Sequence, residues 1–542
     1  MSSVPDPVDS KNAPPPPGTP SRAYANYVLF VLVLVYVFNF IDRQILSILA
    51  EDIKADLGLS DASLGFLYGT AFAVFYAIFG IPLARLADVW VRKNLIAVGL
   101  FFWSAMTALS GTARGFGSLA AYRIGVGVGE SSSSPAAFSI LGDYFPPRLR
   151  ATAVAIYSSG VYIGAGIGIF LGGIVVDGWN RAYPPGSGTA PFGLAGWQAA
   201  FFVVGLPGLL MAVWVWTLRE PIRGMSEGLV QRAAHPHPFR ATFRETAAVL
   251  PPFTVWSLWQ SGAGARGLGI NLAIAAACAL GAWGLIGLLG SAPQWIALAI
   301  GLYAFFSWLQ GLELRDRGAF AMIYGSRAVV LGMIGFAWCA FVGYGVGFWV
   351  PPYFQRAHGV TASEAGMVLG LSAAIGGWLG VTSGGIFSDW LRRRSPRARP
   401  YVGIISSALA APALVVLVTT RDLTTAYVAN VAFQVFSSAW IGSAIALSNE
   451  LVMPRMRATA SAYYLLAVTF IGLALGPYAM GQVSDRLVRG GAVPAEALGR
   501  GMLISLIAYG IAIAFLWLTS RYVEREESSR LERAAAVGEE VT

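Results

Sequence analysis

Long apolar runs recur along almost the whole chain, and they constrain its fold more than any other feature. Each run holds about 18 residues or more, enough for a helix to cross the roughly 30 Å hydrocarbon core of a bilayer. Only 12% of the 542 residues are charged, against about 25% in a soluble domain. These numbers exclude a soluble globular protein, and we predict an all-α polytopic membrane protein.

The apolar runs form two groups of six with a further pair between them. The first six lie at 26–50, 62–87, 94–112, 117–141, 150–176 and 196–218, and the second six at 320–350, 363–388, 401–420, 424–448, 457–484 and 499–520. The predicted organisation is a disordered N-terminal tail (1–23), a six-helix bundle (24–218), a linker with two extra membrane helices (219–318, with the helices at about 267–290 and 292–310), a second six-helix bundle (319–522) and a cytoplasmic C-terminal tail (523–542).

Basic residues gather in the short loops on one side of the predicted membrane. Arg85, Arg92 and Lys93 follow the second run, and Arg148 and Arg150 follow the fourth. Such loops face the cytoplasm, so we expect a multi-pass protein of the cell membrane with both termini cytoplasmic. Because the net charge of +9 reflects these loops, nucleic acid is not an expected partner.

Two short motifs occur once in each half. Residues 88–93 (Asp-Val-Trp-Val-Arg-Lys) match residues 389–394 (Asp-Trp-Leu-Arg-Arg-Arg), 301 positions later. Residues 147–153 (Pro-Arg-Leu-Arg-Ala-Thr-Ala) match residues 454–460 (Pro-Arg-Met-Arg-Ala-Thr-Ala), 307 positions later. Two matches at nearly one spacing indicate a duplicated six-helix unit and therefore two pseudo-symmetric bundles.

This repeated unit, with its Asp-x-x-x-Arg-Lys loop after the second helix, resembles the major facilitator superfamily of secondary transporters. The matches to that family's G-x-L-a-D-r-x-G-r-k loop are Leu86, Ala87, Asp88, Arg92 and Lys93. The departures are Ala84 and Val91 in place of glycines and Val89 in place of an arginine. The resemblance implies two six-helix bundles around a central site.

Two further segments resemble the spinster branch of that superfamily. They are residues 39–43 (Asn-Phe-Ile-Asp-Arg) in the first run and 123–131 (Arg-Ile-Gly-Val-Gly-Val-Gly-Glu-Ser) in the fourth. Animal spinsters are linked to export of lysolipids and sphingosine phosphate. The resemblance therefore implies a bacterial-type member in the inner membrane, with a lysolipid-like, sphingolipid-like or organic-anion substrate.

Four ionisable residues lie inside these two runs, where a charge costs at least about 2.5 kcal/mol on insertion scales. Helix geometry places Asp42 and Arg123 at one depth, and Glu130 two turns further along the face of Arg123. We hypothesise that Asp42 and Glu130 exchange protons, while Arg43 and Arg123 stabilise their ionised forms and bind an anionic head group. The alternative is a fixed ion pair that holds the first and fourth helices together.

A second charged group lies at the predicted cytoplasmic helix ends. It is interpreted as a gate that closes the cytoplasmic side, with Asp143 as a partner of Arg92. The gate residues are Asp88, Arg92, Lys93, Asp143, Asp389 and Arg393. The alternative is ordinary positive charge on cytoplasmic loops.

Aromatic and hydroxyl side chains in the predicted bundles are candidates for lining a central cavity. We predict that the lining includes Ser131, Phe341, Tyr344 and Phe436. The aromatic members would suit an acyl chain. The alternatives are lipid contact for the aromatic rings and helix-to-helix hydrogen bonding for the serine.

Together these features predict a proton-coupled secondary transporter that works by alternating access as a monomer. Protons are the expected coupling ion, and no other cofactor and no metal is expected because the two cysteines lack metal-type spacing. The remaining alternatives are a passive facilitator, an exporter of drugs or organic ions, and a membrane-embedded lipid-modifying enzyme. The enzyme is disfavoured, because the intramembrane charges include no candidate catalytic histidine.

Overall fold

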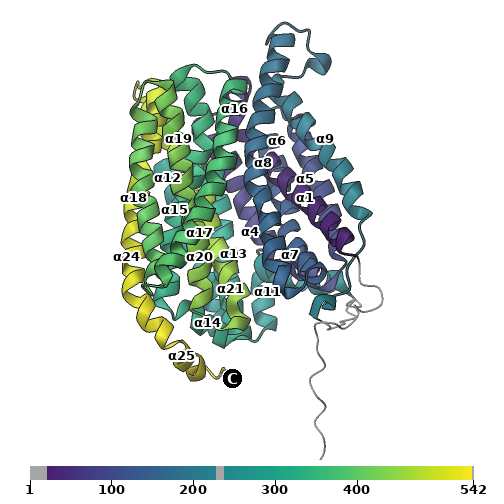
Figure 1. The fold of residues 1–542 in the computed structure, drawn as a ribbon, viewed down its shortest axis with the longest axis vertical. Helices are drawn as coiled ribbons and strands as arrows, with labels where there is room; N and C mark the ends of the chain where they lie inside the picture. Colours follow the sequence, from purple (N-terminus) through teal and green to yellow (C-terminus); the bar gives the residue numbers. More distant parts are fainter. Residues whose placement is uncertain (1–20, 228–236, 540–542) are drawn as a thin grey trace, which may run out of the picture.

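The computed structural model describes residues 21–227 and 237–539, and this part of the chain is helical without a strand. Thirteen helical segments in it are long and apolar enough to cross a membrane. The all-α polytopic fold is thereby confirmed (Figure 1). The predicted N-terminal tail lies outside the described residues up to position 20, and the first helix begins at Arg22.

Six spans and one short connecting helix make up the N-terminal half. The helices are α1 (Arg22–Ile48), α2 (Ala50–Leu57), α3 (Asp61–Tyr68), α4 (Thr70–Val89), α5 (Arg92–Ser110), α6 (Phe116–Glu130), α7 (Ser133–Tyr144), α8 (Pro147–Ala182) and α9 (Gly196–Trp216). The second span consists of α3 and α4, and the fourth of α6 and α7. The short α2 connects the first two spans.

The C-terminal half has six spans in the same order. Its helices are α15 (Arg327–His358), α16 (Ala362–Leu371), α17 (Gly377–Arg392), α18 (Ala398–Thr419), α19 (Leu423–Ser438), α20 (Ile441–Glu450), α21 (Arg457–Ala467), α22 (Gly476–Arg489), α23 (Pro494–Ile504) and α24 (Leu506–Ser528). Two wider-wound segments, η3 (Ser372–Gly376) and η5 (Val468–Ala474), join α16 to α17 and α21 to α22.

The break in the fourth span follows from its sequence. Ser131 and Ser132 each donate the side-chain hydroxyl to the carbonyl three residues earlier, at 2.8 Å, which competes with the backbone ladder. Pro135 then lacks the N–H that would continue the ladder. Each piece is shorter than a full span, so this broken span and the thirteen continuous ones correspond to the fourteen predicted runs.

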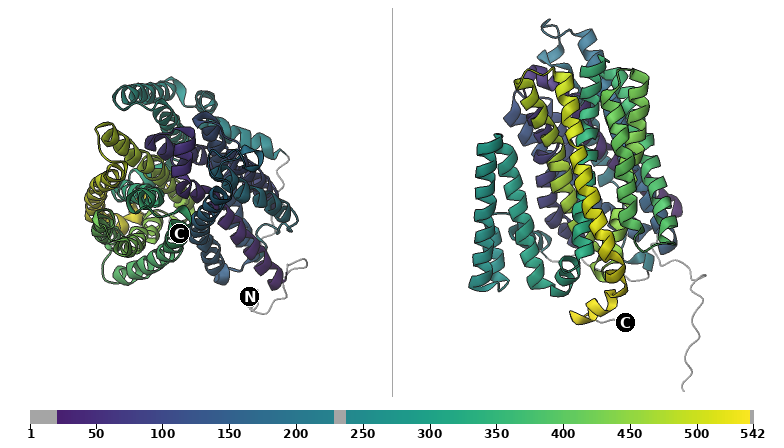
Figure 2. Two further views of the ribbon diagram at one scale, coloured as in Figure 1. Left: turned by 90° about the horizontal axis from the view of Figure 1, so that it is seen from above. Right: turned by 90° about the vertical axis from the view of Figure 1, so that its left-hand side faces the viewer.

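Between the halves, the described part of the linker forms five α-helices. They are α10 (Pro238–Val249), α11 (Phe253–Gln260), α12 (Gly264–Leu289), α13 (Ala292–Arg315) and α14 (Arg317–Tyr324). The two predicted extra membrane helices correspond to α12 and α13. They stand side by side at the edge of the bundle, drawn in teal in Figure 2.

The two halves meet at one end of the molecule, which we call the closed end. It is the end where α1 stops, α3 and α16 begin, and α2 lies, at the top of Figure 1. Ser47 Oγ there donates to the Phe348 carbonyl at 2.6 Å, and Gln355 Nε2 to the Ile48 carbonyl at 3.2 Å. The opposite end, where α1 begins and α24 stops, is called the termini end.

The last helix continues beyond position 522, where the sequence predicted a tail. α24 runs to Ser528 and α25 (Arg530–Ala536) follows it. Glu526 Oε1 accepts the backbone N–H of Arg327 at 3.0 Å, at the start of α15. Glu524 pairs with Arg397 at 2.9 Å. These contacts bind the end of the chain to the loops of its own half.

Candidate functional site

The four intramembrane charges come together inside the N-terminal half. Asp42 and Arg43 lie on α1, Arg123 and Glu130 lie on α6, and all four side chains are buried. α1 is held from the other side by α8, where Gly164 allows close approach. A Cβ at Gly164 would lie 2.4 Å from the Val37 carbonyl oxygen.

Arg43 and Glu130 form a direct ion pair, as the hypothesis of charge partners requires. Arg43 Nη2 donates to Glu130 Oε2 at 2.8 Å. The Arg43 guanidinium also lies 4.3 Å from the ring centre of Phe72 and 4.7 Å from that of Phe40. Aromatic faces stabilise a cation within about 6 Å, so Arg43 has favourable contacts besides its ion pair with Glu130.

Arg123 and Asp42 are neighbours, but their contact differs from the one predicted. Arg123 Nη1 donates to the backbone carbonyl of Asp42 at 3.0 Å, not to its carboxylate. The Asp42 carboxyl group instead lies against Thr107 and Trp103 of α5. Among the residues described, neither of its oxygens has a hydrogen-bond partner that meets normal geometry.

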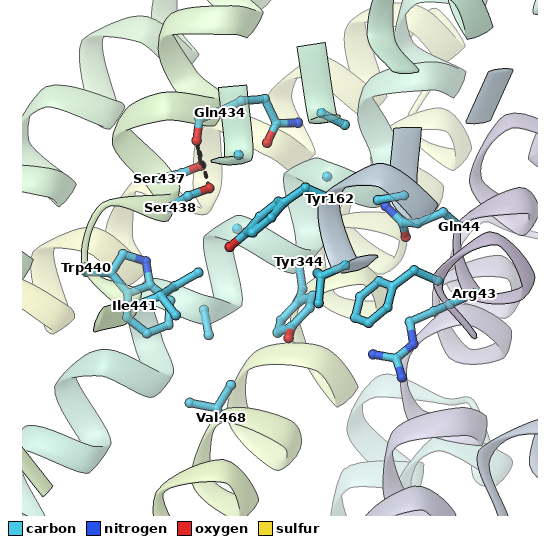
Figure 3. A pocket seen from close by; sticks show the side chains of 18 of the residues that line it. Arg43, Gln44, Tyr162, Tyr344, Gln434, Ser437, Ser438, Trp440, Ile441 and Val468 are labelled. Carbon is cyan, nitrogen blue, oxygen red and sulfur yellow. Dashed lines mark hydrogen bonds between the residues drawn. The ribbon is translucent and has the colours of Figure 1, made fainter. Parts of the chain in front are cut away.

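A cavity of about 260 Å³ lies between the two halves beside these charges (Figure 3). The polar residues of its lining include Arg43, Gln44, Tyr68, Tyr162, Tyr344 and Gln434. Ser437 and Ser438 of α19 also line it, and both donate to the Gln434 backbone carbonyl. The rest of the lining is mainly apolar. One guanidinium therefore faces a cavity whose other polar groups are neutral phenols, amides and hydroxyls.

Only one of the four predicted lining residues faces this cavity. Tyr344 lines it, but Ser131, Phe341 and Phe436 are not among its lining residues. Ser131 bonds back to its own helix. Phe341 lies on a neighbouring face of α15, where it packs against Trp338 at 5.3 Å between ring centres.

The lining residues that sequence reasoning missed follow the helical period. On α15 they are Ala340, Gly343 and Gly347, which share a face with the predicted Tyr344, and on α19 and α20 they include Gln434, Ser437, Ser438, Ile441 and Ile445. A spacing of three and four residues marks one helix face. Composition does not show which face of a helix points to the centre. On α1 the buried charge of Arg43 marks that face, and Phe40 and Gln44 lie on it as well.

At the termini end, the predicted gate residues of the N-terminal half form a network within that half. Buried Arg92 forms ion pairs with Asp143 and with Glu220, the latter at 2.7 Å. The Glu220 carboxylate also accepts the backbone N–H of Lys93 at 3.0 Å. Asp88 lies apart from them, exposed and 3.9 Å from Arg85. Asp143 is thus a partner of Arg92 as predicted, whereas Asp88 is not.

The equivalent residues of the C-terminal half also belong to a network within their own half. Asp389 pairs with Arg399 at 2.8 Å, and Arg399 pairs with Glu450 at 2.8 Å. Arg393 is exposed. Both networks lie within one half, so neither bridges the halves in this conformation.

The charged contacts that do bridge the halves lie at the closed end, and sequence reasoning missed them. Arg356 of α15 pairs with Glu51 and with buried Asp61, each at 2.7 Å. Asp485 of α22 accepts the backbone N–H groups of Asp61 and Ala62 at 2.9 and 2.8 Å. It therefore caps the start of α3.

A second cap occupies the position that the internal repeat makes equivalent to the first. Asp177 of α8 accepts the backbone N–H and the hydroxyl of Ser363 at the start of α16, both at 2.6 Å. Asp177 and Asp485 are 308 positions apart, and α3 and α16 start 301 positions apart. Each half therefore contributes one carboxylate that caps the start of a helix in the other half.

Comparisons with known proteins agree with this architecture. The chain is 25% identical over 508 residues to an MFS-type efflux pump of Mycolicibacterium smegmatis (94% of this chain, 95% of that one). It is 24% identical over 479 residues to the sphingosine-1-phosphate transporter SPNS2 of Danio rerio (83% and 74%). Among solved structures, it resembles a bacterial homologue of the human lysosomal transporter spinster in an inward-facing, unoccupied conformation, with 28% identity and a TM-score of 0.70 over 94% of this chain and 99% of that one.

The family model described as Major Facilitator Superfamily matches residues 32–477, most of both six-helix halves. This match identifies the family without relying on any single motif. The repeated six-helix halves and the cavity between them agree with it. The chain is a multi-pass membrane transporter that belongs to the Major Facilitator Superfamily.

Proposed function

We propose that this chain is a proton-coupled secondary transporter that moves an amphipathic anion by alternating access. The observation that carries the proposal is the buried ion pair of Arg43 with Glu130, because Arg43 also lines the central cavity. One guanidinium is therefore shared between an internal carboxylate and the space where a substrate would bind.

This arrangement couples a proton to an anion. When Glu130 takes up a proton it loses its charge, and Arg43 is then free to pair with an anionic group in the cavity. An anion on Arg43 in turn favours the protonated form of Glu130, since coupling between two sites is reciprocal. Proton and anion thus bind together, which is the relation that a symporter requires.

Asp42 is proposed as the second proton site. Its carboxyl group is buried beside Thr107 and Trp103, and protonation avoids burying an unpaired charge. Arg123 holds the Asp42 backbone at 3.0 Å. A change in the Asp42 side chain is therefore passed directly to α1 and to the neighbouring Arg43.

The lining of the cavity supports an amphipathic substrate. Around one cation it presents mainly apolar and aromatic side chains, including Tyr162, Tyr344 and Trp440. A lysolipid-like molecule matches this pattern, with its anionic group on Arg43 and its chain along the apolar wall. The likeness to a sphingosine-1-phosphate transporter supports the same substrate class.

The direction of access follows from the closed end and from the loop charges. Arg85, Arg92 and Arg150 lie at the termini end, and basic loops face the cytoplasm. We therefore place the termini end in the cytoplasm of a bacterial cell and the closed end on the outer side of its inner membrane. The likeness to an inward-facing spinster homologue supports this assignment.

The test is substrate-driven proton movement in proteoliposomes that contain a pH-sensitive dye and receive 16-carbon lysophosphatidylglycerol. We expect the native chain to move protons when the lipid is added and the Glu130→Gln variant to lose this response. Glu496→Gln is the matched control, because Glu496 is exposed and pairs with Arg500 of its own helix, away from the cavity. Undiminished proton movement in both Glu130→Gln and Asp42→Asn would refute the proposed coupling.

A further inference from the structure

The cavity is flanked by two seams where a helix of one half meets a helix of the other along the membrane-facing surface. On one side α4 meets η5, and on the other α16, η3 and α17 meet α8. The internal repeat makes these seams equivalent, because α3 and α4 correspond to α16 and α17 at a spacing of 301 residues. A simple duplicated transporter would expose both seams to lipid equally.

The equivalent faces differ sharply in their exposure. Thr70, Val74 and Ala77, which follow one face of α4, are 0%, 0% and 6% exposed. Their repeat equivalents Leu371, Ile375 and Trp378 are 59%, 54% and 51% exposed. The same helix face is therefore covered in one half and open to the bilayer in the other.

The cover is the inserted helix α13, which touches both halves. Thr70 Oγ1 lies within hydrogen-bond distance of Gln294 Oε1 of α13 and of the Ala474 carbonyl of the other half, each at 2.7 Å. A Cβ at Gly301 of α13 would lie 3.0 Å from Val74 and 2.5 Å from Phe470. Position 70 holds a threonine, which makes a polar contact with α13, whereas its repeat equivalent, position 371, which has no such helix beside it in the described part of the chain, holds a leucine.

The uncovered seam carries an apolar groove of about 390 Å³. It is lined by Ile163, Gly166, Ile167 and Phe170 of α8 and by Met367, Gly370, Leu371 and Ala374 of the facing helix. The groove lies directly behind the central cavity, since Ala165 and Ala373, next in sequence to Gly166 and Ala374, line the cavity itself.

Close backbone packing of two glycines lies between the groove and the cavity. A Cβ at Gly166 would lie 2.5 Å from the Gly370 carbonyl, and one at Gly370 would lie 2.6 Å from the Gly166 carbonyl. Two glycines present no side chains that interlock across the seam. At these two positions the helices are therefore in contact through their backbones.

We propose that the inserted pair closes one seam to the bilayer, so that the hydrocarbon chain of an amphipathic substrate passes only through the α8–α16 seam and seats in its groove. The head group then lies at Arg43 and the chain leads out past Gly166 and Gly370. The groove suits a hydrocarbon chain because its lining is apolar and continuous with the wall of the head-group cavity. This inference rests on the proposed function.

The test uses the full chain in nanodiscs with radiolabelled 16-carbon lysophosphatidylglycerol and, as a headgroup probe without a chain, sn-glycerol 3-phosphate. Ala374→Trp fills the groove from the C-terminal half, and Ile167→Trp fills it from α8. Ala299→Trp is the matched control, since Ala299 lines a similar apolar groove between α12 and α13. Arg43→Gln removes the head-group site.

We expect Ala374→Trp and Ile167→Trp to weaken lysolipid binding at least tenfold, about 1.4 kcal/mol. The affinity of these variants for sn-glycerol 3-phosphate, measured by competition with the bound lysolipid, should equal that of the native chain. Ala299→Trp should stay within twofold of the native chain, and Arg43→Gln should weaken both probes. One outcome would refute passage of the chain through the α8–α16 seam and leave the proposed function standing. In it, both groove variants bind lysolipid as tightly as Ala299→Trp does, while Arg43→Gln no longer binds lysolipid. If Arg43→Gln binds lysolipid normally, or the native chain binds none, the proposed substrate site falls and the route falls with it.

Discussion

At the scale of single residues, the site depends on an arginine with two kinds of partner. Arg43 pairs with Glu130 at 2.8 Å and lies 4.3 Å from the ring centre of Phe72. Its planar guanidinium can keep the ring contact while its hydrogen bonds change partner, which a lysine ammonium group does less well. The aromatic contact thus holds Arg43 in place when Glu130 takes up a proton.

A lysine at this position should show the difference. We expect Arg43→Lys to retain proton coupling but to lower lysolipid-driven proton flux about tenfold, since stacking of a buried guanidinium on an aromatic ring contributes about 0.5–2 kcal/mol. Flux is measured in proteoliposomes beside Arg43→Gln, which should show none. Native flux in Arg43→Lys would mean that charge alone is sufficient.

At the scale of helices, the closed end is held by carboxylates that cap helices of the opposite half. Asp485 caps α3, and Asp177 caps α16. A carboxylate at a helix start contributes about 1 kcal/mol through its hydrogen bonds and the helix dipole. These caps exist only while the closed end is shut, so they favour the present conformation over one that opens there.

Asp485→Asn should therefore shift the equilibrium toward opening at this end. The expected shift is about fivefold, corresponding to roughly 1 kcal/mol. It is measured as faster labelling of a cysteine introduced at Tyr344 by an impermeant maleimide added from the closed side, after Cys278 and Cys339 are replaced by serine. Asp422→Asn is the control, because Asp422 caps α19 within its own half, accepting the Thr425 N–H at 2.7 Å. Equal labelling of the two variants would contradict the role of Asp485.

The end of the chain is a second element whose contacts are electrostatic. Arg455 bonds both Asp316 and Glu539, and it holds the pKa of each carboxyl below its ordinary value. A carboxyl with a lowered pKa stabilises the docked state above its ordinary pKa, about 4, and this stabilisation is lost as the pH falls through the lowered value.

Acid should therefore loosen residues 530–539 before the bundle itself unfolds. We expect hydrogen exchange of this segment, corrected for its intrinsic pH dependence, to rise as the pH falls below about 4. Arg455→Gln should show the same faster exchange already at pH 7. Protection that is identical in the variant and the native chain would mean that other contacts hold the segment.

At the scale of the whole molecule, the sequence predicted the architecture well and the site only in part. Apolar run length and the repeated loop motifs predict helices and duplication, because both are local properties. Spacing on two helices also grouped the four intramembrane charges, but it did not predict that Arg43 pairs with Glu130 while Arg123 bonds the Asp42 backbone. The bridging caps could not be predicted, because Asp177 and Ser363 become neighbours only when two halves pack. The lining residues Gln434 and Tyr162 were missed for the same reason.

Relative movement of the halves should be blocked by a covalent bond across the closed end. We expect the pair Asp177→Cys and Ser363→Cys, whose native side chains touch at 2.6 Å, to form a disulfide that stops lysolipid-driven proton flux until it is reduced. The control pair Asp422→Cys and Thr425→Cys joins two neighbours within one half and should leave flux unchanged. Full activity with the first pair oxidised would exclude opening at this end as part of the cycle.

The reciprocal caps also bear on how such a chain arose. Asp177 and Asp485 are equivalent in the repeat, and so are the starts of α3 and α16. A single six-helix unit with one such aspartate and one such helix start would therefore carry both partners of the contact. Two copies related by a twofold axis would then make that contact twice, as in any isologous dimer. The closed end is, in this sense, a homodimer interface whose two subunits now belong to one polypeptide.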